Sequence, residues 1–541
     1  MKKLFAGMLL FLAASLHSQN NFWPVDSLLV QYNKPETAGV SVLVVKDGKV
    51  VYNKQAGYAN IEKKQPVTPQ TVFCLASVSK QFTASCIVLL EQKHKLSFKD
   101  QLSKYFPEYS KKNITILDLL NHTSGIKNHE VISLIKGKEK LNYTNKEIRE
   151  LLAPQELDFE PGTAFSYSNS GYWYLVRIVE KVSGESIVDF AQKNIFKPLK
   201  MKNTNYSYSF NSVKNAATGY KKENGINVIC PVNSGEGSIA GGGVYGTAED
   251  LNLWLTEMDN KKVLGEAFWN TILNQDAYEF DKENKSFYTK GLFITNYGGK
   301  KCISHGGDVE GFHNDLTYLP EAKMHVIILS NNDETKKALL FQAAANLSLG
   351  FGFKMPKAAM PAPTVKLSKD VLEKYVGIYE FEPGVAYKVT ANDGFLNFTQ
   401  LWDGVYLSVN ASNSNTFPLD PDVVFTFNDE KNGKTQMLHL NQEGQEADFK
   451  RVDSAVMADF TSYTGRFRSE LLNVEYDFFI KDGLLYYTID KGIAQTTEIV
   501  DENLISIKEG KITYQRNADG VANEFILNHP RAKNFKFERI N

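Results

Sequence analysis

The sequence has few cysteines, and none of them lies in a pattern that binds zinc. Its 541 residues include four cysteines, at positions 74, 86, 230 and 302, and no two of them form a CxxC pair. This spacing argues against a zinc site, and four cysteines are too sparse for a disulfide scaffold. In an exported protein they could pair with one another, or they could be buried free thiols.

The chain also lacks an excess of charge of either sign. It holds 61 Lys and Arg against 62 Asp and Glu, a formal net charge of −1. This balance gives no reason to expect nucleic acid or an anionic membrane as a partner. The hydrophobic content of 43% and the charged content of 23% are typical of soluble globular proteins. A chain of this length is expected to form two or three domains.

Long apolar runs are missing after the first residues. Lys2 and Lys3 precede an apolar stretch from Leu4 to Leu16, and the small Ser18 follows it. This pattern predicts a cleaved signal peptide over residues 1–18, since the apolar run is too short for a confident membrane span. We therefore expect a periplasmic or secreted protein with no transmembrane segment in the mature chain.

The region from 19 to 354 has the pattern of one α+β domain. Residues 39–52 read as a β-hairpin that turns at Asp47-Gly48. Strand patterns return between 291 and 329, and an amphipathic helix over 334–349 follows them. Strands at both ends with helices between them predict one antiparallel sheet flanked by helices.

The remaining sequence begins with a proline-rich stretch, 355–366, that we interpret as a linker. Beyond it the chain repeats itself at an offset of 88 residues. Tyr375-Val-Gly-Ile-Tyr379 matches Tyr463-Thr-Gly-Arg-Phe467, and Phe449-Lys-Arg-Val452 matches Phe537-Glu-Arg-Ile540. Both units are rich in short strands and turns, so we predict two small antiparallel β-barrels over 367–453 and 454–541.

The strongest chemical signal is Ser77-Val-Ser-Lys80 at the expected start of a helix. This spacing places the serine and the lysine on one face, where the lysine can act as a base for the serine. The alternative is an ordinary serine cap with a solvated lysine. The pattern alone does not decide, because Ser124 to Lys127 and Ser133 to Lys136 also fit it.

Two further stretches carry polar groups in turns. Tyr167-Ser-Asn169 precedes an expected helix, and His305-Gly-Gly307 ends an expected strand. Taken singly, each has an ordinary structural explanation: a packed tyrosine, a helix-capping asparagine and a turn histidine.

Together and in this order, the three motifs resemble those of the serine β-lactamase and penicillin-binding-protein superfamily, in its class C β-lactamase and DD-peptidase-like branch. The resemblance covers about residues 30–350 and extends to Leu119-Leu-Asn-His-Thr-Ser-Gly125 and Gly241-Gly-Gly-Val-Tyr-Gly-Thr-Ala-Glu-Asp250. It implies the β-lactamase/DD-peptidase fold, followed here by two lipocalin-like barrels as in D-aminopeptidases.

The resemblance also implies roles for individual residues. Ser77 corresponds to the nucleophile, Lys80 to its base, and Tyr167 to the residue that shares proton transfer. For substrate binding it implies Asn169, His305, Gly306 and Gly307, with strand residues near Gly307 and the N–H of Ser77 forming an oxyanion hole. It implies no metal and no organic cofactor.

The third motif has histidine where typical β-lactamases have lysine. An imidazole with an ordinary pKa near ~6.5 is mostly neutral at pH 7 and anchors a substrate carboxylate more weakly than a lysine does. The resemblance therefore favours a D-aminopeptidase or DD-carboxypeptidase-like enzyme acting on a small-molecule or short peptide substrate. The alternatives are an esterase, a β-lactamase, and a binding or sensing protein without turnover. Neither the oligomeric state nor the role of the barrels follows from the sequence.

Overall fold

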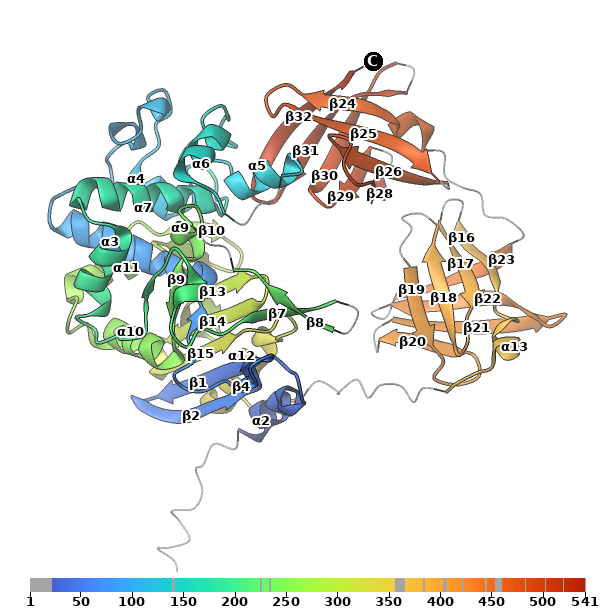
Figure 1. Ribbon diagram of the computed structural model, residues 1–541, viewed down its shortest axis with the longest axis horizontal. Coiled ribbons are helices and arrows are strands. Elements are labelled where there is room, and N and C mark those ends of the chain that lie inside the picture. Colours follow the sequence, from blue (N-terminus) through green and yellow to red (C-terminus); the bar gives the residue numbers. More distant parts are fainter. Residues whose placement is uncertain are drawn as a thin grey trace, which may run out of the picture. The chain divides into compact units, whose positions relative to one another are not determined.

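The structure is a computed structural model that describes residues 22–138, 142–223, 226–232, 235–355, 365–382, 385–401, 406–420, 423–442, 445–452, 460–481, 483–501, 503–518 and 520–540. The expected signal peptide and most of the expected linker lie outside these residues. The described chain forms two compact units (Figure 1). The first lies within Met1–Glu130 and Lys140–Lys354, and the second within Val131–Glu139 and Met355–Asn541.

The first unit is built on one antiparallel sheet whose strands come from both ends of its sequence. In spatial order the strands are β10 (Tyr278–Asp281), β11 (Ser286–Thr289), β12 (Leu292–Tyr297), β13 (Lys300–Val309), β14 (Phe312–Leu319), β15 (Met324–Ser330), β1 (Val40–Lys46) and β2 (Lys49–Ala56). The β1–β2 hairpin turns at Asp47 and Gly48, which both have positive φ. This arrangement confirms the predicted hairpin and the predicted sheet.

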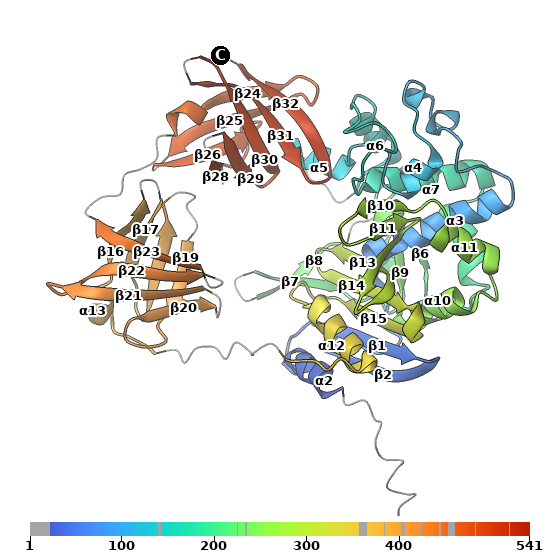
Figure 2. The same ribbon diagram turned by 180° about the vertical axis from the view of Figure 1, so that it is seen from behind.

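Helices cover both faces of this sheet. On one face α2 (Trp23–Leu29) and α12 (Lys337–Leu349) pack against Val42, Val326 and their neighbours. The other helices are α3 (Lys80–Gln92), α4 (Ile116–Leu120), α5 (His129–Ile135), α6 (Asn145–Leu152), α7 (Asn169–Ser183), α8 (Ile187–Ala191), α9 (Ile239–Gly242), α10 (Ala248–Asn260) and α11 (Glu266–Asn274). Among these, α10 packs against β1 and β15 (Figure 2). Strands β1 and β15 are almost wholly buried, as their continuous apolar sequences predict.

Helix α3 is buried along the whole of its first half. Residues 80–88 are all buried, because α3 contacts both α7 and α11. Three short pairings complete the unit: β3 (Tyr58–Asn60) with β4 (Gln65–Pro66), β5 (Phe73–Cys74) and β6 (Asn205–Tyr206) with β9 (Val244–Gly246), and β7 (Gly219–Glu223) with β8 (Ile226–Cys230).

The second unit contains two barrel-like antiparallel sheets, which confirms the predicted fold class. The first sheet has the order β19 (Tyr406–Asn410), β18 (Phe395–Gln400), β17 (Val385–Ala391), β16 (Gly377–Glu382), β23 (Gln445–Val452), β22 (Lys434–Gln442), β21 (Val423–Lys431) and β20 (Thr416–Asp420), preceded in sequence by α13 (Lys369–Leu372). The second has the order β27 (Gln495–Thr496), β26 (Leu484–Ile489), β25 (Val474–Lys481), β24 (Gly465–Ser469), β32 (Ala532–Ile540), β31 (Ala522–His529), β30 (Gly510–Arg516), β29 (Leu504–Ile507) and β28 (Glu498–Asp501).

The 88-residue repeat has a structural basis in each barrel. Arg451 lies over the ring of Tyr379 at 4.8 Å, and Arg539 lies over the ring of Phe467 at 4.8 Å. A Cβ atom at Gly377 or at Gly465 would come within 2.0 Å of the arginine of its own barrel. Each repeat thus uses a glycine on its first strand to admit the arginine of its last strand.

Helix α5 runs from the first unit into the second. His129 and Glu130 belong to the first unit, and the residues that follow belong to the second. There the backbone oxygen of Ile135 accepts a hydrogen bond of 2.9 Å from the Tyr476 hydroxyl, and Gly137 faces the Ile489 side chain. Residues 131–138 are therefore part of the packing of the second barrel.

All four cysteines are described, and all are buried free thiols. Of the two alternatives open at the sequence level, the structure therefore has the unpaired one. Within the described ranges, no helix has both the length and the apolarity that crossing a bilayer requires.

Candidate active site

Ser77 lies in a short 3₁₀ turn, Ala76–Ser79, that leads directly into α3. The residue before it, Ala76, has φ of +46°, a left-handed conformation that costs a non-glycine residue roughly 1–2 kcal/mol. Strain of this kind is found at functional sites, where the surrounding structure holds it in place. Here the backbone N–H of Leu75 donates to the oxygen of Val244 at 2.9 Å, on the neighbouring strand β9.

Lys80 is the first residue of α3, and it is fully buried beside Ser77. Its Nζ lies 3.2 Å from the Ser77 Oγ and donates to the backbone oxygen of Gly241 at 3.0 Å. The pairing predicted from the four-residue spacing is thus present as a direct contact. An amine at this distance can exchange a proton with the hydroxyl.

Tyr167 and Asn169 are close to this pair, at the start of α7. The Lys80 Nζ lies 4.8 Å from the centre of the Tyr167 ring. Ser168 caps α7, with its hydroxyl accepting from the Gly171 N–H. Asn169 donates from Nδ2 to Glu130 Oε2 at 2.7 Å, a contact that no local sequence pattern indicated.

Gly306 and Gly307 lie on β13 where one edge of this strand is left open. Pairing between β12 and β13 ends at Phe293 and Ser304, whereas pairing between β13 and β14 continues to Val309. Residues 305–309 therefore have no β12 partner on one side. Backbone donors along such an edge can bind an extended ligand.

His305 occupies a different environment from the one its motif suggested. Its side chain is 2% exposed and is not among the residues that line the cavity described below. Nδ1 donates to the Gly306 oxygen at 2.6 Å, Nε2 lies 3.3 Å from the Tyr288 hydroxyl, and the Phe293 ring lies beside the imidazole. Burial and the nearby Lys80 lower the pKa of His305 to about 3. The imidazole is therefore neutral at pH 7.

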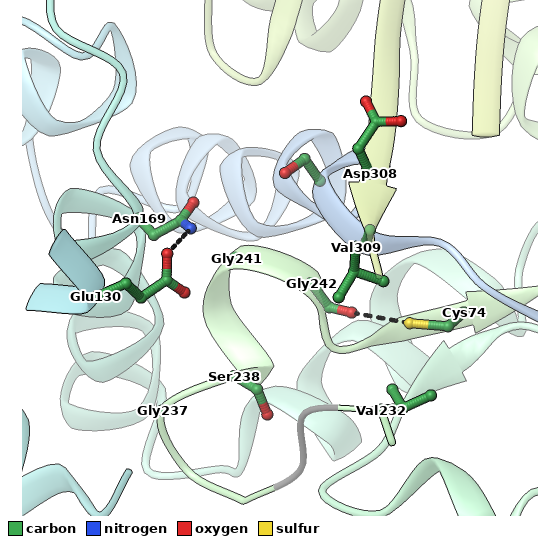
Figure 3. A pocket seen from close by; sticks show the side chains of 12 residues that line it. Cys74, Glu130, Asn169, Val232, Gly237, Ser238, Gly241, Gly242, Asp308 and Val309 are labelled. Atoms are coloured by element: carbon green, nitrogen blue, oxygen red, sulfur yellow. Dashed lines mark hydrogen bonds between the residues drawn. The ribbon is translucent and has the colours of Figure 1, made fainter. Parts of the chain in front are cut away.

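A cavity of ≈ 70 Å³ opens beside Ser77 (Figure 3). It is lined by Cys74, Ala76, Ser77, Glu130, Asn169, Val232, Gly237, Ser238, Gly241, Gly242, Asp308 and Val309. Within this lining the charged side chains are Glu130 and Asp308, both carboxylates. The sequence did not predict that either acidic residue would lie here.

Asp308 belongs to a charged network at one wall of the cavity. His313 Nδ1 lies 2.6 Å from Asp308 Oδ1, and Lys337 also binds this oxygen. Burial opposes ionisation of Asp308, but these hydrogen bonds hold the pKa of the carboxyl below its ordinary value. The hydrogen bond that His313 donates to Asp308 raises the pKa of His313, although partial burial opposes this. Across the described part of the chain, no group of three or more His, Cys, Asp or Glu could hold a metal ion.

Lys290 is a buried lysine in the turn between β11 and β12. It is fully buried and donates to the Gln275 oxygen. Burial, partly opposed by Asp276, lowers its pKa from 10.5 to about 8. Between pH 8 and pH 10.5, Lys290 holds more protons in the unfolded chain than in the folded chain. The free energy of unfolding therefore increases with pH across this range.

Lys290→Met is therefore expected to increase stability at pH 7, where the wild-type protein must bury a cation, by on the order of 2 kcal/mol. The advantage should shrink as the pH rises from 8 toward 10.5. The measurement is the urea midpoint of both proteins at pH 7, 8.5 and 9.5, with Lys282→Met, at an exposed lysine, as the control. A difference that does not vary with pH would contradict the prediction.

Comparisons with known proteins place the chain among β-lactamase-like sequences and structures. The sequence profile described as beta-lactamase matches residues 25–350. Penicillin-binding protein 4* of Bacillus subtilis (strain 168) is 27% identical over 372 residues, which are 65% of this chain and 82% of that protein.

Two solved structures have a similar fold. The octameric penicillin-binding protein homologue from Pyrococcus abyssi is 22% identical with a TM-score of 0.55, and the match covers 87% of this chain and 99% of that one. The D-amino acid amidase from Ochrobactrum anthropi SV3, complexed with D-phenylalanine, is 20% identical with a TM-score of 0.54. This match covers 62% of this chain and 100% of the amidase chain. At these identities the likeness establishes the fold alone.

Proposed function

The chain belongs to the beta-lactamase family, and from this premise we propose that it is an exported serine hydrolase that cleaves amides of D-amino acids through an acyl-enzyme. The observation that carries the proposal is the contact of 3.2 Å between Lys80 Nζ and Ser77 Oγ beside a cavity. Residues 1–18 would direct the protein out of the cytoplasm as a cleaved signal peptide.

In the first step Ser77 Oγ attacks the carbonyl carbon of the substrate, and a neutral Lys80 accepts the hydroxyl proton. Tyr167, whose ring lies against Lys80, passes a proton to the leaving nitrogen as the C–N bond breaks. The negative charge on the carbonyl oxygen is stabilised by the N–H of Ser77 and by backbone donors of the open β13 edge near Gly307. A water molecule then hydrolyses the acyl ester on Ser77, with Lys80 and Tyr167 again transferring the protons.

The charges of the cavity support an amine-bearing substrate. Both charged side chains in its lining, Glu130 and Asp308, are carboxylates. Asp308 is already paired with Lys337 and His313, so Glu130 carries the preference. A substrate carboxylate, as in a β-lactam or a C-terminal D-amino acid, would be repelled by Glu130, whereas an ammonium group would be attracted. The neutral His305 adds no cation that could offset this preference. Among the enzymes implied by the family, a D-aminopeptidase or D-amino-acid amidase fits this lining better than a DD-carboxypeptidase does.

The test is a hydrolysis panel of D-alanyl p-nitroanilide, its N-acetyl derivative, a D-Ala-D-Ala peptide, a short acyl p-nitrophenyl ester and nitrocefin. We expect kcat/KM for the free amine to exceed that for the N-acetyl compound by about 10–100-fold, the range of a charge-assisted hydrogen bond. Glu130→Gln should reduce this ratio by roughly 10-fold, because Gln keeps the oxygen that faces Asn169 but loses the charge.

Glu321→Gln, at an exposed carboxylate away from the cavity lining, is the matched control and should leave the ratio unchanged. Fastest turnover of the ester would favour an esterase, and fastest turnover of nitrocefin a β-lactamase. Equal rates for the free and the acetylated amine would reject an ammonium subsite.

A further inference from the structure

His122 contacts the Tyr167 loop through both its backbone and its side chain. It follows α4 and is 1% exposed. Its backbone oxygen accepts from the Ser166 N–H at 2.9 Å, and its Nδ1 accepts from the Ser168 N–H at 3.1 Å. These two amides flank Tyr167, so one residue holds the backbone on both sides of it.

The His122 ring also packs directly on the Tyr167 ring. The two centroids are 4.3 Å apart at an interplanar angle of 37°. Tyr172 and Tyr288 contact the same imidazole, with centroids at 5.0 and 4.7 Å. The imidazole is thus wedged among aromatic rings and has little freedom to move, which in turn limits the orientations open to Tyr167.

The backbone at His122 is unusual as well. Its φ is +60°, in the left-handed region, which few non-glycine residues adopt and where asparagine, aspartate and histidine are the most frequent of them. Asparagine would occupy this conformation more easily than histidine. Asparagine at position 122 is therefore compatible with this backbone conformation.

From this geometry we infer that His122 is a positioning residue: it holds Tyr167 in the place from which its hydroxyl serves Ser77 and Lys80. The inference rests on the catalytic role proposed for Tyr167. Because Nδ1 accepts a hydrogen bond from a backbone N–H, that nitrogen carries no proton. The imidazole contributes a hydrogen-bond acceptor and a flat surface.

Two substitutions separate these contributions. His122→Phe keeps a flat ring against Tyr167 and removes the acceptor for the Ser168 N–H. His122→Asn keeps an acceptor at nearly the same position and suits the left-handed backbone, but it removes the ring. Either variant may be combined with Tyr167→Phe, which removes the hydroxyl that His122 is inferred to position.

The experiment measures kcat and KM for these variants with the fastest substrate of the panel. Tyr167→Phe should lower kcat by about 10²–10³-fold, as loss of an acid–base group does. His122→Phe should lower kcat by about 10–100-fold with KM changed less than about 3-fold, and His122→Asn should recover part of the loss. The double variant His122→Phe/Tyr167→Phe should be no more than about 3-fold slower than Tyr167→Phe alone.

The inference would be overturned if the reductions in kcat caused by His122→Phe and by Tyr167→Phe multiplied in the double variant. It would also be overturned if His122→Phe had the same kcat as the wild type. If His122→Phe does not fold, His122→Asn and its double variant give the same comparison. A Tyr167→Phe variant with wild-type kcat would instead refute the role proposed for Tyr167. Failure of that role and failure of the role inferred for His122 can therefore be distinguished. Labelling of Ser77 by a fluorophosphonate probe reports on the nucleophile independently of both.

Discussion

Ser77→Ala is expected to abolish covalent labelling by a fluorophosphonate probe and to lower kcat/KM by at least ~10³-fold, since removing an activated nucleophile leaves only binding and oxyanion stabilisation. The reason is local: Ser77 is the hydroxyl within 3.2 Å of the buried Lys80 Nζ at the cavity wall. The measurement is labelling in a gel, with kcat/KM for the best substrate of the panel.

A suitable control lies on the same helix. Ser85 is buried in α3, and its hydroxyl donates to the Gln81 oxygen one turn earlier. Ser85→Ala therefore removes a hydroxyl from α3 outside the cavity and should keep full labelling and turnover. Equal labelling of Ser77→Ala and wild type would show that another residue reacts. In that case the assignment of Ser77 as the nucleophile would be rejected.

Gly307→Ala should produce a similarly large loss for a steric reason. A Cβ atom at Gly307 would lie 2.1 Å from the backbone oxygen of Leu75, which directly precedes the strained Ala76 and Ser77. Either β13 or the turn that carries Ser77 must move to admit it. We expect a loss of about 1–3 kcal/mol in stability. We also expect a loss in kcat of roughly 10²-fold or more, because displacement of a nucleophile by about 1 Å is sufficient for that.

Gly306→Ala is the matched control, one residue away on the same strand. Its added Cβ would meet the Lys337 Nζ at 3.4 Å and the Asn314 oxygen at 3.6 Å, which are ordinary contact distances. We therefore expect the thermal midpoint and kcat of this variant to be close to those of the wild type. The measurement is the thermal midpoint and kcat for both variants. The steric explanation fails if the two alanines behave alike.

Much of the first unit follows from the sequence because its signals are local. The hairpin at Asp47-Gly48, the glycine that ends α7 at Gly184 and the Thr247 cap of α10 each depend on a few neighbouring residues. The Ser77–Lys80 contact is local too, since one helical turn joins the two residues. The repeat that predicts two barrels is visible in the sequence itself.

Other features depend on packing between distant segments, which no local pattern records. Glu130 reaches the cavity because α5 lies beside the start of α7, where Asn169 binds its carboxylate. His305 is neutral, as its residue type suggested, but the burial that lowers its pKa comes from strands and loops around it. Contacts from several sides bury the whole first half of α3, including the polar residues Gln81 and Thr83.

The course of α5 has a consequence for the order in which this protein folds. Ile135 and Tyr476, which are hydrogen-bonded in the second unit, are 341 positions apart in the chain. During synthesis the segment 131–138 emerges long before Tyr476 and Ile489, which contact Ile135 and Gly137. Contacts of such long range close slowly, because a large loop must be ordered before they form. The segment 131–138 therefore acquires its final neighbours within the second unit only when the last barrel has been made.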